Sequence, residues 1–565
     1  MTSIEDSKQD AGEQPVLAEA VPLSPAARRW QTVEGWLSRL SDGLNPILVK
    51  EARQALRSRQ FTITFFLMLA AGWTWSILGL SMLGPSAYYN ATGPTMFYVY
   101  YVILAAPLIV VIPYTAYSSL AGERQDRTYE LVSITGLEAS GILFGKLCSI
   151  GMQMLIYLSA LLPCLAFTYL LRGLDIFTVL LVVFYTCLLS IGLALGGLLL
   201  ATLSPPRQRY VIVGVIFAVS LFYVFGMVST LLGAMVAQGI SLDDPEFWSV
   251  NLSLALLYAN LAAVVFLCAR AQLMSPSQNR SSAIRVALTI AHLSAVGWFA
   301  WAVLRLDDDF VYGMLYLGTI IWFLCGLVMV GESDQLSSRV RRALPRSAIG
   351  RALFGWYMPG SGTGYTFVLW HMLVLCIVAP LMTSALVGEL AQALSTTVRT
   401  VGNYNAPDRV FEACLVATSY LAIYLGLTRL ILMAVRRYDE VRLSVRFLTG
   451  VLLVMFLGGG PWVLQIANPQ TRNLNYTLLQ ATNPIWTLSE YCMYHGPPAG
   501  AGEVLVIVLP LAGALIWALN LPSIAGQLNA RRVAMPERVV EEDRALATAA
   551  LRPVGAANPW SDQAT

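Results

Sequence analysis

Seven charged side chains lie between Ala121 and Leu147, and the stretches on either side of this segment are long and apolar. Its last part, GILFGK from Gly141 to Lys146, has the glycines and the lysine of a phosphate-binding loop. Such a loop needs the pattern G-x-x-x-x-G-K-[ST], because its amides surround the phosphates and the hydroxyl group binds magnesium. Here Gly141 and Gly145 are one residue too close, and Leu147 replaces the hydroxyl. We therefore expect any ATP to be bound by another chain.

Other reaction chemistry is equally hard to find. The sequence has no Ser/His/Asp arrangement, no paired carboxylates within an apolar stretch and no Cys/His cluster with the spacing of metal ligands. We expect no catalytic residue, no metal site, no cofactor and no enzymatic activity. Six polar residues fall in or near apolar stretches, and we expect them to serve helix packing: Gln153, Asn260, His292, His371, Arg429 and Gln465. The histidines are far apart in sequence, which suggests no proton relay, and Arg429 lies where it could extend to the membrane surface.

The composition is that of an integral membrane protein. Of 565 residues, 57% are hydrophobic and only 12% are charged, whereas soluble domains have about 25% charged residues. Apolar runs of membrane-spanning length favour helices over a barrel. The expected fold class is an all-α polytopic membrane protein. Length and hydropathy predict about twelve spans, at 61–83, 96–120, 147–171, 176–203, 210–236, 249–269, 286–304, 310–330, 365–387, 411–434, 445–466 and 503–521.

Loop charges predict the orientation. If the N-terminus is cytoplasmic, the inner segments carry 21 Lys and Arg residues and the outer loops five. The positive-inside rule then places both termini in the cytoplasm of a cell whose plasma membrane holds the protein. The outer loop 467–502 is expected to form a small cap or a hairpin, and GGGPW at 458–462 could break or kink the eleventh span.

The N-terminal region precedes the first span. Residues 1–44 are expected to form a cytoplasmic tail, disordered to residue 24 and with an interfacial helix over 25–40. The next stretch, NPILVKEARQALRSRQF, predicts a basic amphipathic helix on the membrane surface, because Leu48 and Ala52 share a face opposite to Lys50, Arg53 and Arg57. An ordinary positive flank of the first span is the alternative.

The charged segment itself predicts a docking element. Its charged start is followed by the apolar patch LVSITGL, which ends at Gly136. A short helix with charged ends and an exposed apolar centre is suited to a groove on a soluble partner. A solvated loop is the plainer alternative.

Together, the two segments resemble the membrane subunit of type-2 ABC transporters, the exporter-type permeases. That family has an amphipathic connecting helix before the first span, and a loop after the second span with a pattern like E-R-x-x-x-T-x-E-x-L followed by a G-K that enters the third span. The matching residues are Glu123, Arg124, Thr128, Glu130, Leu131, Gly145 and Lys146. The resemblance covers roughly residues 45–270, about six spans, and departs from the family in the second membrane region, 271–521, and the cytoplasmic tail, 522–565.

The resemblance implies a function. The chain would be the permease of an ATP-driven exporter, and the matching residues would couple it to a cytoplasmic ABC ATPase, with Lys50, Arg53 and Arg57 in the connecting helix. The family's usual unit has six spans and acts as a pair, so the further partner would be a second copy or a second permease, besides membrane lipid; no nucleic acid is expected.

Two other functions fit the composition. A secondary transporter would use acidic or histidine residues inside the membrane as ion sites, and the first eight spans offer almost none. A membrane scaffold would have the docking segment but no substrate path. The apolar, aromatic-rich spans are compatible with lipids, drugs or a polymer as the substrate.

Overall fold

The computed structural model of the chain is helical throughout the part that it describes, with 89% of the residues in helices and no strand there. It describes residues 46–84, 89–126, 128–129, 138–203, 207–238, 245–305, 310–345, 347–382, 407–436, 443–467, 476–493, 501–529, 532–534 and 536–550. The all-helical fold class is therefore confirmed for these ranges.

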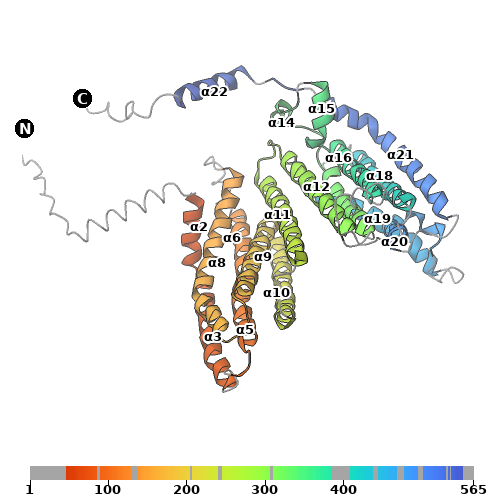
Figure 1. Ribbon diagram of the computed structural model, residues 1–565. Coiled ribbons are helices and arrows are strands. Elements are labelled where there is room, and N and C mark those ends of the chain that lie inside the picture. Colours follow the sequence, from red (N-terminus) through yellow and green to blue (C-terminus); the bar gives the residue numbers. More distant parts are fainter. Residues whose placement is uncertain are drawn as a thin grey trace, which may run out of the picture. The chain divides into compact units, whose positions relative to one another are not determined.

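The chain forms two compact units, whose boundary falls within α9 and α10. Unit 1 comprises residues 1–194 and 214–237. Its helices, drawn from red to yellow in Figure 1, are α2 (Pro46–Leu56), α3 (Arg59–Leu83), α5 (Gly93–Ala106), the π-helical segment η1 (Pro107–Val111), α6 (Ile112–Gln125), α8 (Ala139–Leu170), and most of α9 (Ile176–Leu203) and α10 (Arg207–Gln238).

Unit 2 comprises residues 195–213 and 238–565. Its further elements, drawn from yellow-green to blue in Figure 1, are α11 (Pro245–Leu273), α12 (Ser282–Arg305), α13 (Phe310–Val330), α14 (Ser338–Arg342), α15 (Ala348–Phe354), η2 (Gly355–Tyr357), α16 (Ser361–Met382), α18 (Pro407–Arg436), α19 (Leu443–Ala467), η3 (Leu478–Thr482), α20 (Pro484–Met493), α21 (Ala501–Leu528) and α22 (Glu537–Ala550).

Twelve helical stretches in the described ranges are long and apolar enough to cross a membrane. They coincide with the twelve predicted spans to within a few residues at most ends, and 310–330 agrees at both ends. The largest difference is at the third span, where α8 begins at Ala139, eight residues before the predicted start at 147. The chain is thus suited to a multi-pass membrane protein, while the orientation of its termini stays a prediction.

The second span contains a π-helical turn. Pro107 begins η1, and the N–H of Ile112 donates to the carbonyl of Pro107, five residues earlier. Pro113 has no N–H, so the carbonyl five residues before it, that of Leu108, receives no backbone donor from it. The hydroxyl of Ser190 in α9 donates to this oxygen at 2.5 Å. A side chain of a neighbouring helix therefore satisfies the backbone group that the proline leaves open.

Helix α18 is the centre of unit 2, packing against α13, α16, α19, α20 and α21. Of the window that qualifies it as a span, 67% is buried, the highest share among the twelve. Gly426 lets α21 approach closely, because a Cβ atom there would lie 2.5 Å from Ile516. Small residues at such crossings are the usual means of close helix packing in membranes.

Other expectations have mixed outcomes. The GGGPW stretch does not break its span, because α19 continues through Pro461 to Ala467. In the outer loop, residues 476–493 form η3 and α20. The tail, 522–565, contains the helix α22. The expected helix over 25–40, the disordered tail 1–24 and the apolar patch LVSITGL lie outside the described residues. The domain boundary expected near residue 270 stays a prediction.

The bond from Ser190 to the π-helical turn gives a first prediction. We expect Ser190→Ala to lower the free energy of unfolding by about 1 kcal/mol, the size of an interhelical hydrogen bond in a membrane. The control is Ser159→Ala, because the exposed Ser159 hydroxyl donates only to Ile156 in its own helix. Denaturant unfolding in detergent micelles measures both variants, and equal losses would show that the Ser190 bond adds nothing.

Candidate functional site: an ion cluster that joins three helices

Helix α2 packs one face against α8. Ile47 and Ala52 are buried on that face, and Glu51 is buried with them. Lys50, at the edge of that face, and Arg53, on the opposite side, are exposed. Because residues four apart share one face of a helix, Glu51 follows the line of Ile47 and carries a carboxylate to the packed side. The structure thus has a helix at Pro46–Leu56 that carries a charge on its packed face, while its place on a membrane surface stays a prediction.

Lys146 lies inside α8, about two turns after the helix begins at Ala139. The residue is only 3% exposed, and Gly145 before it is buried as well. The GILFGK stretch is therefore helical and does not form the open loop that wraps a phosphate. A buried ammonium group is costly unless carboxylates and hydrogen-bond acceptors surround it, which raises the question of what holds this one.

Three side chains from two other helices hold the Lys146 ammonium. Its Nζ lies 2.9 Å from Oε1 of Glu51 in α2 and 3.1 Å from Oε2 of Glu123 in the last turn of α6. It also donates to the hydroxyl of Ser119 in α6 at 3.0 Å. The Ser119 hydroxyl in turn donates to Oε2 of Glu51 at 3.3 Å. A single cation thus fastens α2, α6 and α8 to one another.

Lys50 closes the cluster on its solvent side. Its Nζ lies 3.1 Å from Oε1 of Glu123 and 3.8 Å from Oε1 of Glu51. The pKa of the Lys50 ammonium is raised above its ordinary value: partial burial acts to lower it, but the hydrogen bond to Glu123 and the nearby carboxylates together raise it more. The four residues Lys50, Glu51, Glu123 and Lys146 form the ion cluster, in which two lysines face two carboxylates.

The ion cluster is suited to transmitting force between helices and is not arranged for acid–base catalysis. Each carboxylate is paired with both lysines, so neither is left in the role of a general base. Buried ion pairs add little net stability, but separating them is expensive, because each displaced charge loses its partner in a medium of low dielectric constant. A force on α2 is therefore passed to the ends of α6 and α8.

The structure brings together some of the predicted coupling residues. Glu123, Lys146 and Lys50 meet in the ion cluster, and the hydroxyl of Thr128 donates to the carbonyl of Glu123 at 3.1 Å. Gly145 lies in α8, Arg124 is half-buried at the end of α6, and Arg53 and Arg57 are exposed on the far side of α2. Glu130 and Leu131 lie outside the described residues.

Sequence reasoning missed Glu51 and Ser119. A signal for Glu51 was present, because it lies four residues after Ile47 and four before Ala55, on the apolar line of the helix. An acidic residue on that line needs a cation across the interface. Ser119 lies four residues before Glu123 and so shares its face of α6. It resembles any other serine in a span, and nothing in the sequence distinguishes it.

Unit 2 contains two fully buried arginines. The guanidinium of Arg285 in α12 lies 2.6 Å from a Glu332 carboxylate oxygen and donates to the carbonyls of Trp356 and Met358 at 2.6 Å each. Arg429 in α18 donates to Asn520 at 2.8 Å and to a serine at the start of α16. Arg429 therefore points into the core, where these acceptors lie, and the expectation that it extends to the membrane surface was wrong.

Two histidines meet inside unit 2, although they are 79 positions apart in the sequence. The rings of His292 in α12 and His371 in α16 have centroids 5.3 Å apart. Nδ1 of His292 accepts from the indole N–H of Trp322 at 3.2 Å, and Nε2 of His371 lies 3.0 Å from the Thr289 hydroxyl. The Nε2 atom of His292 is buried without a hydrogen-bond partner among the described residues. The distance in sequence concealed this pair.

Comparisons of the chain with models of protein families, with curated proteins and with solved structures find no match. The resemblance stated above therefore rests on the residues of the two segments alone.

The ion cluster gives a second prediction. Lys146→Met leaves Glu51 and Glu123 facing each other without their shared cation. We expect it to lower the free energy of unfolding by about 3 kcal/mol, the lower end of the range for a broken buried pair. Glu123 retains some contact with solvent, which limits the loss.

Arg53→Met is the matched control, because Arg53 is exposed on the same helix α2. It should change the free energy of unfolding by less than about 0.5 kcal/mol. Denaturant unfolding in detergent measures both variants. A Lys146→Met protein as stable as the wild type would refute the proposed role of Lys146 as the central cation.

Proposed function

We propose that the chain is the membrane subunit of an ATP-driven transporter of the type-2 ABC class, an exporter located in the plasma membrane. The observation that carries the proposal is the ion cluster, which ties α2 to the ends of α6 and α8. These are the elements that adjoin the charged segment 121–147. The family pattern in that segment supports the same assignment, since Glu123 and Lys146 belong both to the pattern and to the cluster.

The mechanism that follows is mechanical. A separate ATPase pair binds ATP, closes and pushes on the connecting helix α2 and on the charged segment. Because Lys146 is bonded to Glu51 and to Glu123, α2, α6 and α8 move together instead of sliding past one another. The spans then tilt between inward-facing and outward-facing states. In this proposal the ATPase hydrolyses ATP, and the membrane chain transmits the resulting movement to its spans.

Two surfaces of the N-terminal helix have different roles in this proposal. The face with Glu51 is packed against α8 and transmits force. The opposite face presents Arg53, which is exposed, and Arg57 follows directly after the helix. These two arginines can meet an acidic surface of a cytoplasmic partner or anionic lipid headgroups, because exposed guanidinium groups bind carboxylates and phosphates well.

A co-purification experiment tests the ATPase partner. We expect the detergent-solubilised wild-type chain to retain an ABC ATPase, and Glu123→Arg to release it, because a second cation beside Lys146 would repel that lysine and drive α2 from its site. Arg53→Glu should also weaken retention, but without loss of stability, since its side chain is exposed. Quantitative mass spectrometry of the eluate measures both.

Glu541→Arg is the control, because this exposed acid in α22 takes no part in the ion cluster. Retention of the same ATPase by wild type, Glu123→Arg and Arg53→Glu alike would place the docking surface elsewhere. If no ATPase co-purifies with any form, the ABC assignment fails, whatever the stability of the variants.

The histidine pair favours a second function, a proton-coupled secondary transporter. Ionisable residues inside a membrane span are costly and often mark an ion path. His292 and His371 lie about ten residues, or roughly 15 Å, inside α12 and α16 respectively. This depth suits a proton site. The ATP-driven mechanism proposed above uses no ionisable residue at this depth.

A measurement of proton movement across a membrane distinguishes this second function from the ATP-driven one. Vesicles containing only the purified chain and a pH-sensitive dye are given a pH gradient without ATP. A secondary transporter should dissipate the gradient faster than empty vesicles do, and His371→Gln should abolish the difference. His495→Gln, in the outer loop, is the control. A gradient that persists as long as in empty vesicles argues for the ATP-driven function.

A further inference from the structure

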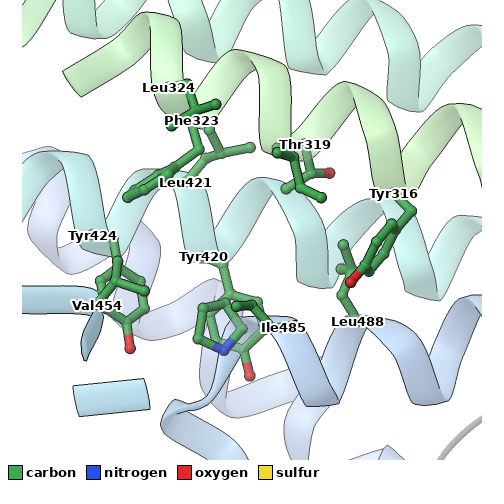
Figure 2. A pocket seen from close by; sticks show the side chains of 12 residues that line it. Tyr316, Thr319, Phe323, Leu324, Tyr420, Leu421, Tyr424, Val454, Ile485 and Leu488 are labelled. Atoms are coloured by element: carbon green, nitrogen blue, oxygen red, sulfur yellow. The ribbon is translucent and has the colours of Figure 1, made fainter. Parts of the chain in front are cut away.

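Unit 2 contains an apolar cavity between α13, α18, α19 and α20 (Figure 2). Its volume is about 230 Å³. Aromatic and aliphatic side chains form nearly all of its wall, among them Tyr316 and Phe323 from α13 and Tyr420 and Tyr424 from α18. The residues of the ion cluster, the two arginines and the two histidines do not line this cavity. Neither of the two proposed transport functions assigns it a role.

Apart from the Tyr316 hydroxyl, the side-chain polar groups of the wall are hydrogen-bonded to the protein. The hydroxyl of Tyr420 donates to the carbonyl of Ala481 at 2.7 Å, and the hydroxyl of Tyr424 donates to the carbonyl of Thr482. The hydroxyl of Thr319 donates back to Leu315 in its own helix at 2.6 Å. Besides the Tyr316 hydroxyl, what remains toward the cavity is therefore carbon. An apolar cavity of this size holds apolar molecules and stays free of water.

The cavity is open at its side. Ile320, Leu324 and Ile485 belong to its wall and are exposed. A second, more open hollow of about 570 Å³ adjoins it and shares Val454 and Ile485 with it. We refer to the cavity and this adjoining hollow together as the recess.

The surroundings decide which molecule fills such a recess. α13, α18 and α19 are all candidate membrane spans, so their exposed apolar side chains face lipid chains instead of water. From Tyr316 to Leu324 the wall follows α13 for about 12 Å, at 1.5 Å per residue. That length suits part of a hydrocarbon chain lying along the helix.

We propose that this recess is a binding site for one acyl chain of a membrane lipid. The chain enters beside Ile320 and Ile485 and lies against Tyr420 and Tyr424. The Tyr316 hydroxyl makes no hydrogen bond to another described residue, and it can donate to an ester oxygen at the polar end of the chain. The proposal does not depend on which of the two transport functions applies.

Photochemical labelling tests the site. The full chain is reconstituted in vesicles of phosphatidylcholine and phosphatidylglycerol that contain a phosphatidylcholine with a diazirine in one acyl chain. After illumination, labelled residues are located by tandem mass spectrometry. We expect labelling at Tyr420 and Tyr424 that saturates as the mole fraction of the probe rises, because a bound site fills while mere contact with the bilayer increases in proportion.

Two variants fill the recess. Thr319→Trp places an indole in the cavity, and Ile320→Trp places one at its opening; each should abolish labelling at Tyr420 and Tyr424. Leu317→Trp is the matched control, because Leu317 is exposed on the same helix and does not belong to the wall. It should leave that labelling unchanged.

Either of two results would overturn the proposal. One is unchanged labelling of Tyr420 in both recess variants when their elution from a sizing column shows them to be folded. The other is wild-type labelling that increases linearly with the probe. If Thr319→Trp does not fold, Ile320→Trp decides alone, because its side chain lies at the exposed edge of the wall.

Discussion

The ammonium group of Lys146 lies in the interior of unit 1, and α2, α6 and α8 are arranged around the need to compensate it. Glu51 comes from one helix and Glu123 from another, so neither helix can shift without withdrawing a carboxylate. The apolar contacts between these helices have no direction and would tolerate sliding. The ion pairs are directional, and they hold the three helices together where the second span ends and the third begins.

Unit 2 also has buried cations that need compensation, and they are arginines instead of lysine. The guanidinium of Arg285 gathers Glu332 and several backbone carbonyls that precede α16, and Arg429 gathers the side chains of α16 and α21. A planar group with five donors can bind several segments at once, which an ammonium group does less well. Each unit therefore has a few buried charged residues at places where several helices meet, and these places determine which helices stay together.

Hydropathy and length were sufficient to predict the spans, because every span must be apolar over the thickness of a bilayer and no other feature of this chain satisfies that condition. The family pattern selected Glu123 and Lys146, and the structure places both in the ion cluster, while their role in coupling stays a prediction. The partner Glu51 was missed, since its place in the cluster depends on how α2 is turned toward α8. His292 and His371 were both named, but their pairing was missed for a related reason, because only the packing of α12 against α16 brings them together. Periodicity along one helix contains no information on which helix is its neighbour.

The π-helical turn at Pro107 affects the direction in which the side chains at the end of α6 point. Each residue added to or removed from a helix rotates everything beyond it by about 100°. The segment η1 accommodates the extra residue of an i→i+5 bond, so it resets the rotational phase between α5 and α6. Had the helix continued with regular α geometry, the Glu123 side chain would be rotated by about 100° about the axis of α6, away from its present direction toward Lys146. A small backbone irregularity four turns distant is thus what aims the carboxylate.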